Sequence, residues 1–107
     1  MTTELPAPVR AMIEAANNGD LAGFLAGFTD DGVVDDWGRE FRAAAQIRAW
    51  SDAEFIGKQV TLAVREISQI NGDTVVSAQV GGNGFNGPSH FSFRLSGDRV
   101  SRLTIRA

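Results

Sequence analysis

Two adjacent carboxylates, Asp35 and Asp36, are the side chains best suited to proton chemistry, and they lie in an apolar, extended run at residues 33–37. Successive side chains of a strand point to opposite faces, so only one of the two can enter the interior. A carboxyl group facing an apolar cavity is desolvated, which makes it a usable proton acceptor or donor. The alternative for Asp36 is a carboxylate in water, or one bonded to Arg39 or Arg42.

His90 is the only histidine and a second candidate base. Alternation along residues 89–96 places it on the face opposite Phe91 and Phe93. Because the two phenylalanines should face the interior, we predict that His90 lies on the exposed face. A dyad of Asp36 with His90 is the alternative, and it would require a bulge that reverses the local register.

Large side chains could enclose a pocket beside the carboxylate. Trp37 and Trp50 could line it with the indole N–H as a polar handle, or they could pack in the core. Met12 and Phe55 are expected on the inward sides of their helices, where the same two alternatives apply. The predicted pocket surrounds one of the two aspartates and comprises the following residues: Met12, Trp37, Trp50, Phe55, Ser89 and Phe91.

Other motifs point away from cofactors and metals. Residues 82–87 match GxGxxG, which binds dinucleotides where it opens a helix, but here Pro88 and another extended run follow. We therefore interpret the motif as a hairpin loop. The acidic residues at 30, 31, 35 and 36 lack the spacing of a calcium loop, so we predict no metal site and no cofactor.

Composition excludes several classes of protein. The 107 residues are 43% hydrophobic and 21% charged, which suits one domain spanning residues 1–107. The net charge is −3 without a basic cluster, so we expect no nucleic-acid partner. We expect no membrane span and no signal peptide, because no apolar run is long enough and residues 1–4 lack a basic region. The absence of cysteine excludes disulfides and thiolate zinc sites and fits a cytoplasmic location.

The first half of the chain reads as helical. Apolar residues at three- and four-residue steps predict a helix from about Leu5 to Ala16, capped by Thr3, and a second one capped by Asp20 and running to Phe28. Residues 30–32 are predicted to form a turn, residues 33–37 a strand, and residues 40–42 a short partner strand. A third helix should span residues 43 to about 55, with a break near Trp50 as an alternative.

The second half reads as strands at residues 59–70, 73–81, 89–96 and 99–106. Asn71-Gly72 between two β-rich runs predicts a hairpin with a type I′ turn, in which both central residues need a positive φ. The order of elements predicts an α+β domain in which three N-terminal helices cover one face of a curved, mainly antiparallel sheet of about six strands.

The run from Asn17-Asn18-Gly19-Asp20 to Asp36-Trp37 resembles the opening of SnoaL-like and ketosteroid-isomerase-like proteins. In those proteins a helix, an N-G-D turn, a second helix ending in phenylalanine and an acidic turn precede a strand that carries an aspartate. Residues 45–50 look like their third helix, and residues 88–93 look like their penultimate strand. The resemblance covers nearly the whole chain and implies the cone-shaped fold of the nuclear transport factor 2-like (NTF2-like) superfamily. It is specific for the fold and weak for any one activity.

The resemblance implies that Asp36, rather than Asp35, is the general base. The tyrosine of the steroid isomerases falls at Met12, and their second aspartate falls at Ser89. Those groups donate hydrogen bonds to the developing enolate, and one such donor is typically worth about 3 kcal/mol of the barrier. We therefore predict no efficient steroid isomerisation.

Two functions remain open from the sequence. The first is a cofactor-free isomerase, cyclase, dehydratase or hydrolase that acts on a small apolar molecule of polyketide, terpene or steroid type. The second is a non-catalytic binding module or a purely structural dimeric domain. In either case we expect a homodimer through the open sheet face, whose predicted residues are Thr61, Ala63, Arg65, Ser77, Gln79, His90, Ser92, Arg94, Arg102 and Thr104.

Overall fold

Two short helices open the described chain, which covers residues 5–107 in the computed structural model. The first, α1 (Ala7–Asn17), begins after Pro6 and buries Val9, Met12, Ile13, Ala15 and Ala16. The predicted cap Thr3 lies outside the described residues. The second, α2 (Leu21–Ala26), is capped as predicted, because the Asp20 carboxylate accepts a hydrogen bond of 3.0 Å from the Gly23 amide.

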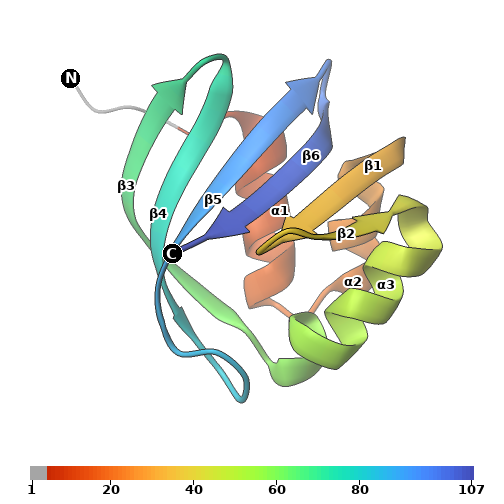
Figure 1. The fold of residues 1–107 in the computed structure, drawn as a ribbon, viewed down its shortest axis with the longest axis vertical. Helices are drawn as coiled ribbons and strands as arrows, with labels where there is room; N and C mark the ends of the chain where they lie inside the picture. Colours follow the sequence, from red (N-terminus) through yellow and green to blue (C-terminus); the bar gives the residue numbers. More distant parts are fainter. Residues whose placement is uncertain (1–4) are drawn as a thin grey trace.

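Within residues 5–107, six strands form one sheet in the order β2-β1-β6-β5-β4-β3 (Figure 1). Only the β1–β6 pair is parallel, and the other neighbours are antiparallel. The bounds are β1 (Phe28–Asp36), β2 (Arg39–Arg42), β3 (Thr61–Ile70), β4 (Asp73–Gly81), β5 (Gly87–Ser96) and β6 (Arg99–Arg106). A third helix, α3 (Ala43–Glu54), and a 3-10 turn, η1 (Ile56–Lys58), connect β2 to β3.

The helices cover one face of the sheet, where α1 lies behind β5 and β6 and α3 runs beside β1 and β2 (Figure 1). The core lies between these layers and includes Phe24, Ile47, Phe93, Val100 and Leu103. In the described part of the chain, the opposite face has no helix on it and carries polar side chains of β3 to β6. The predicted α+β class, with helices on one face of a mainly antiparallel sheet, is confirmed.

The structure corrects the prediction around residues 28–32. Helix α2 ends at Ala26, and Phe28 begins β1, so the predicted turn at residues 30–32 lies within this strand. The register with β6 shifts between Phe28 and Val33 and accommodates the extra residues. Phe28 is drawn into the core, where its ring packs edge-on against Phe24 at 5.4 Å between centroids. Burial of this ring outweighs the turn preference of the acidic residues.

Helix α3 is continuous through Trp50, so the break weighed at that residue does not occur. Ser51 is fully buried, and its hydroxyl accepts a hydrogen bond of 3.4 Å from the Ile56 amide beyond the helix end. Residues after α3 form η1 before β3 begins at Thr61, two residues later than predicted.

Two hairpin predictions are confirmed. Asn71 and Gly72, which join β3 to β4, have φ values of 52° and 86°, as a type I′ turn requires. The GxGxxG run at residues 82–87 connects β4 to β5 and opens no helix. This loop is held by a hydrogen bond of 2.7 Å from the Asn83 amide to the Lys58 carbonyl of η1.

Candidate functional site

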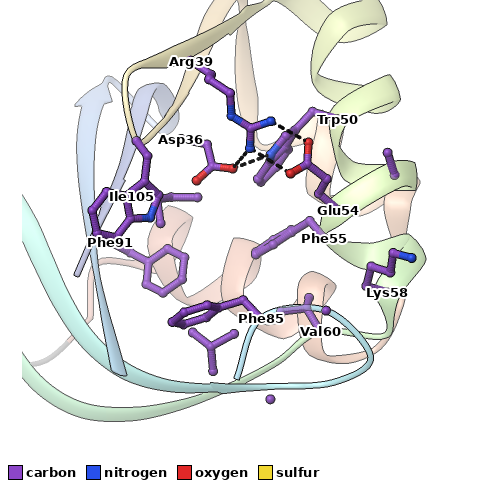
Figure 2. A pocket seen from close by; sticks show the side chains of 15 residues that line it. Asp36, Arg39, Trp50, Glu54, Phe55, Lys58, Val60, Phe85, Phe91 and Ile105 are labelled. Carbon is purple, nitrogen blue, oxygen red and sulfur yellow. Dashed lines mark hydrogen bonds and ion pairs between the residues drawn. The ribbon is translucent and has the colours of Figure 1, made fainter. Parts of the chain in front are cut away.

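A cavity of about 430 Å³ opens between α3, the β1–β2 turn and the β4–β5 loop (Figure 2). Its floor is the end of the sheet where β1, β4, β5 and β6 come together. Its size is in the range of small-molecule pockets. The lining residues are Asp36, Trp37, Arg39, Trp50, Ala53, Glu54, Phe55, Lys58, Val60, Val80, Gly81, Gly84, Phe85, Phe91 and Ile105.

The structure brings five of the residues predicted from the sequence into this lining: Asp36, Trp37, Trp50, Phe55 and Phe91. They come from β1, the β1–β2 turn, α3, the residue after it, and β5. Their indole and phenyl rings make the wall next to Asp36 mostly aromatic. The aromatic wall continues through Trp50 and Phe55, whose rings stack at 4.8 Å.

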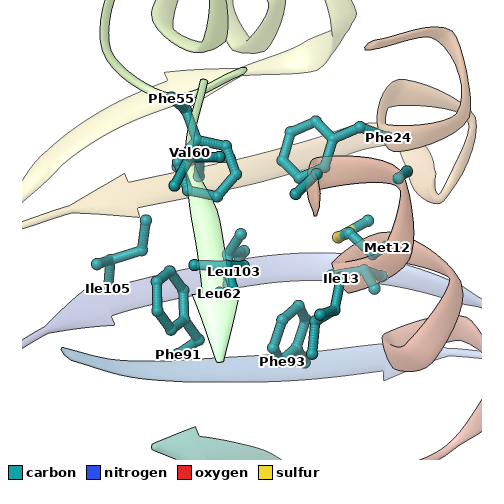
Figure 3. Packing of buried hydrophobic residues seen from close by; sticks show 14 of the residues in the cluster. Met12, Ile13, Phe24, Phe55, Val60, Leu62, Phe91, Phe93, Leu103 and Ile105 are labelled. Atoms are coloured by element: carbon teal, nitrogen blue, oxygen red, sulfur yellow. The ribbon is translucent and has the colours of Figure 1, made fainter. Parts of the chain in front are cut away.

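Two predicted pocket residues, Met12 and Ser89, lie outside the cavity lining. Met12 is 2% exposed and belongs to the buried cluster shown in Figure 3. It borders a separate void of about 10 Å³. Phe55 and Phe91 border both spaces, so their rings fill the region between Met12 and the cavity. Ser89 is 3% exposed and pairs with Ala78 of β4, and Phe91 lines the cavity in its place.

Strand alternation separates the two adjacent carboxylates. Asp36 pairs in register with Ile105, and both line the cavity. Asp35 points to the open face of the sheet, where it forms ion pairs of 2.8 Å with Arg102 and 3.0 Å with Arg106. The hydrogen bond from Arg106, supported by those from the Gly38 amide and Arg102, lowers the pKa of Asp35 to about 2 against the effect of its burial.

The Asp36 carboxylate is held through one of its two oxygens. Its Oδ2 accepts hydrogen bonds of 2.6 Å from Arg39 Nη2 and 3.1 Å from Trp50 Nε1. Within residues 5–107 no donor reaches Oδ1, and this oxygen is not sealed from solvent. Figure 2 shows Oδ1 directed away from Arg39 into the cavity. A bond from Asp36 to Arg39 was the predicted alternative to a place in the pocket. In the structure Asp36 has both, because it binds Arg39 and lines the cavity.

Arg39 and Glu54 are functional candidates that the sequence analysis missed as a pair. Arg39 donates to Glu54 from Nη1 at 2.9 Å and from Nη2 at 2.8 Å, so one guanidinium joins two carboxylates (Figure 2). The bonds to Glu54, and then to Asp36, raise the pKa of Arg39, and the same bond from Arg39 lowers the pKa of Glu54. The four-residue spacing of Trp50 and Glu54 places both on one side of α3, and this spacing could have indicated that Glu54 lies near a pocket lined by Trp50.

Two exposed aromatic residues border the cavity, Trp37 at 58% and Phe85 at 56% exposure. Trp37 occupies the first position of the two-residue β1–β2 turn with a φ of 56°. A bulky side chain is rare in this left-handed region, and such strain is often found at functional sites. Phe85 is carried by the GxGxxG run, which was predicted to be a hairpin loop but not to border the cavity.

His90 is exposed on the open face of the sheet, as predicted, and takes no part in the cavity lining. It pairs with Ser77 of β4 and Arg106 of β6. The alternative dyad with Asp36 is therefore absent. Among residues 5–107, no three histidine or acidic side chains come together as metal ligands, and no helix has the length and apolar character needed to cross a bilayer.

The comparisons with known proteins agree with this architecture. Residues 9–103 match the family model of the SnoaL-like domain. A search among proteins of curated function gives no match.

Among solved structures, a proposed polyketide cyclase from Sinorhizobium meliloti is 25% identical, with a TM-score of 0.86 over 95% of both chains. An NTF2-like protein of unknown function from Cytophaga hutchinsonii is 11% identical, with a TM-score of 0.80 over 99% of this chain and 93% of that one. A protein with a ketosteroid isomerase-like fold from Catenulispora acidiphila, in complex with trimethylamine, is 19% identical. Its TM-score is 0.81 over 97% of this chain and 87% of that one. These likenesses establish an NTF2-like fold.

Proposed function

We propose, starting from the fact that the chain belongs to the SnoaL-like domain family, that its cavity binds a small, mostly apolar molecule and presents Asp36 to it. Residues 1–107 would then act as one domain with one site. The observation that carries this proposal is the state of the Asp36 carboxylate. Oδ2 is fixed by Arg39 and Trp50, while Oδ1 has no donor among the described residues and borders an aromatic cavity.

The polar and apolar parts of the site suit such a ligand. Few polar groups converge on one side of the cavity, and aromatic and aliphatic side chains form the rest, as is typical of small-molecule pockets. Related structures are described with small-molecule roles, one as a proposed polyketide cyclase and another as a complex with trimethylamine. Both descriptions are compatible with a ligand in the same fold.

Proton transfer is the reaction that the residues can support without a cofactor. Oδ1 of Asp36 would take a proton from a carbon or oxygen of the ligand and return it elsewhere, as in an isomerisation, cyclisation, dehydration or hydrolysis. The bonds to Oδ2 would hold the carboxylate in one orientation, which lowers the entropic cost of bringing Oδ1 to the reacting proton. Asp36 is therefore the proposed catalytic residue.

A binding module without chemistry is the second candidate, and one observation favours it. Met12 and Ser89 stand where steroid isomerases have their donors, and neither lines the cavity. The indole N–H of Trp50 is already bonded to Asp36. With few donors left for a developing oxyanion, we retain the prediction of no efficient steroid isomerisation.

Binding can be tested with 1-adamantanol, a rigid neutral probe. The chain has two tryptophans, and both line the cavity, so their indole Nε1–H signals in nitrogen–proton NMR spectra report directly on occupancy. We expect saturable shifts of both signals. The proposed site is wrong if the two signals do not shift with 1-adamantanol, 1-adamantylammonium or 1-adamantanecarboxylate at concentrations up to millimolar.

Catalysis can be tested with 1-adamantyl methyl ketone in deuterium oxide. Abstraction of a methyl proton by Asp36 gives the enolate, which takes back a deuteron, so the methyl proton signal falls with time. We expect exchange to be faster with the wild-type protein than with Asp36→Asn, and Asp98→Asn, an exposed carboxylate in the β5–β6 turn, serves as the matched control. Equal rates for all three would favour the binding module.

The proposal includes a two-fold dimer through the open face of the sheet. The register places the predicted face residues Ser77, Gln79, His90 and Ser92 together on that side, while Arg65 lies at a register shift in β3. The face is polar, and its ion pairs are satisfied within one chain, which suits a wet interface. Sedimentation equilibrium at tens of micromolar should show a dimer, and Ser77→Glu should dissociate it. A wild-type monomer at that concentration would remove this part of the proposal.

A further inference from the structure

The charged groups around the cavity favour one class of ligand, and we infer that the ligand presents a protonated nitrogen to Oδ1 of Asp36. This inference rests on the proposed function, because it names the ligand class for the same cavity. The inferred ligand differs from a purely apolar one because it carries a cationic head on an apolar body. Four observations support it: the local charge balance, the binding of Arg39 to two protein carboxylates, the open oxygen of Asp36 and the aromatic walls.

The charge facing the cavity is negative. Two carboxylates, Asp36 and Glu54, share the single guanidinium of Arg39 through contacts of 2.6 Å and 2.8 Å. Lys58 also borders the cavity, but its amine is directed away from it (Figure 2). A ligand cation would neutralise the remaining negative charge, whereas a ligand anion would add to it at short range.

Arg39 offers little to an anionic ligand. Its Nη2 donates to both Asp36 and Glu54, and its Nη1 donates to Glu54. Three of its five N–H groups are therefore used, including both on Nη2. A ligand carboxylate at Nη2 would have to displace Asp36 or Glu54 and leave that group without its partner, and one at the remaining N–H groups would bind a guanidinium already shared by two carboxylates. The guanidinium is therefore an internal counter-ion and a poor anchor for ligands.

Oδ1 of Asp36 is an acceptor that lacks a donor. Arg39 and Trp50 both bind Oδ2, and within residues 5–107 no N–H or O–H reaches Oδ1. An ionised carboxylate can only accept hydrogen bonds, so its natural partner must donate one. A charged N–H donor adds the attraction of a full positive charge to this hydrogen bond, which a neutral hydroxyl cannot supply.

The walls of the cavity are suited to the rest of a cationic head. Five aromatic side chains line it: Trp37, Trp50, Phe55, Phe85 and Phe91. Ring faces attract organic cations within about 6 Å, and a cage of several rings is a common means of binding substituted ammonium groups. The aliphatic side chains of Val60, Val80 and Ile105 complete the lining and can contact an apolar body.

Three probes with one adamantyl body separate charge from shape: 1-adamantylammonium, 1-adamantanol and 1-adamantanecarboxylate at neutral pH. Titrations followed through the two indole signals give their dissociation constants. We expect the ammonium to bind at least about tenfold more tightly than the alcohol, and the carboxylate to bind most weakly. Asp36→Asn should remove most of the advantage of the ammonium over the alcohol, while Asp98→Asn should leave that advantage unchanged.

The outcomes distinguish the two proposals. Binding of the alcohol or the carboxylate at least as tightly as the ammonium overturns the cationic ligand and leaves the cavity as a binding site. An advantage of the ammonium that survives in Asp36→Asn also overturns the inference, because the preference would then arise elsewhere. No binding of any probe refutes the proposed function itself.

Discussion

The indole nitrogen of Trp50 donates a hydrogen bond of 3.1 Å to Oδ2 of Asp36 and so connects α3 to the last residue of β1. Arg39 donates to the same oxygen at 2.6 Å. The two donors fix the carboxylate from the side of the helix and leave Oδ1 directed to the cavity. Helix α3, through Trp50, and strand β2, through Arg39, together determine which oxygen of Asp36 can meet a ligand.

Replacing Trp50 with Phe tests this relationship. The variant keeps an aromatic ring in the core but removes the N–H, so we expect the free energy of unfolding to fall by about 1–3 kcal/mol. Binding of 1-adamantylammonium should weaken as well, because Asp36 loses one of its two fixed contacts. Urea unfolding and NMR titration measure the two effects. Trp37→Phe is the control for loss of an indole elsewhere on the cavity, and unchanged stability in Trp50→Phe would contradict the role assigned to the bond.

Local patterns in the sequence predicted much of the fold and part of the site. Strand alternation alone required Asp35 and Asp36 to face opposite sides, and the Asn71-Gly72 pair specified its own turn. These features depend on neighbours in the chain. The resemblance to a known family then selected Asp36 over Asp35 for the cavity, and the structure has that arrangement.

The features that the sequence did not reveal depend on packing between distant elements. Arg39 reaches Glu54 only because α3 returns alongside the β1–β2 hairpin. Met12 faces inward as expected, but the rings of Phe55 and Phe91 close the space between it and the cavity. An inward direction can be deduced from periodicity, whereas the choice between core and cavity depends on how large side chains fill the interior.

The Asp35 ion pairs should make stability fall in acid. Because the pKa of Asp35 is about 2 in the folded protein, below its ordinary 3.8, the folded state binds this proton less readily than the unfolded state. The stabilisation is therefore complete above about pH 5 and is lost as the pH falls through 4 towards 2; it amounts to about 2 kcal/mol. Urea unfolding across this range measures the slope.

The variant Asp35→Asn isolates this contribution. It should lower stability by about 2 kcal/mol at neutral pH, and its difference from the wild type should shrink as the pH falls below about 4. Asp98→Asn should run parallel to the wild type at every pH. Glu54, whose pKa Arg39 lowers, contributes to the slope of both proteins and cancels in the comparison. A constant difference between Asp35→Asn and the wild type down to pH 2 would contradict the assignment.

Met12 provides a test of where the core ends and the cavity begins. Its side chain is 2% exposed and borders the small void in the core rather than the cavity, so Met12→Ala should lower the free energy of unfolding by about 2–5 kcal/mol. The affinity for 1-adamantanol should stay within about twofold of the wild type, since the cavity lining is intact.

Phe85→Ala is the opposite case, because this exposed ring lines the cavity. It should weaken binding with little loss of stability.

Trp37 should show a trade-off between stability and binding. Its φ of 56° and the 88° of Gly38 match a type I′ turn, in which Asn is strongly preferred at the first position. Trp37→Asn keeps the backbone N–H that donates to the Ile105 carbonyl, and it should raise the free energy of unfolding by about 1 kcal/mol. Since an exposed ring is lost from the border of the cavity, 1-adamantylammonium should bind several-fold more weakly.

The β3–β4 turn supplies the matched control for Trp37, because Asn71 holds the same position in a turn of the same type. Asn71→Trp should lower stability by a similar amount and leave binding unchanged, since residue 71 is remote from the cavity lining. A loss of stability in Trp37→Asn would show that the ring contributes more to the fold than its backbone strain removes. Unchanged affinity would show that the ligand does not touch the ring. Only a gain in stability together with a loss of affinity fits a strained tryptophan retained for the ligand.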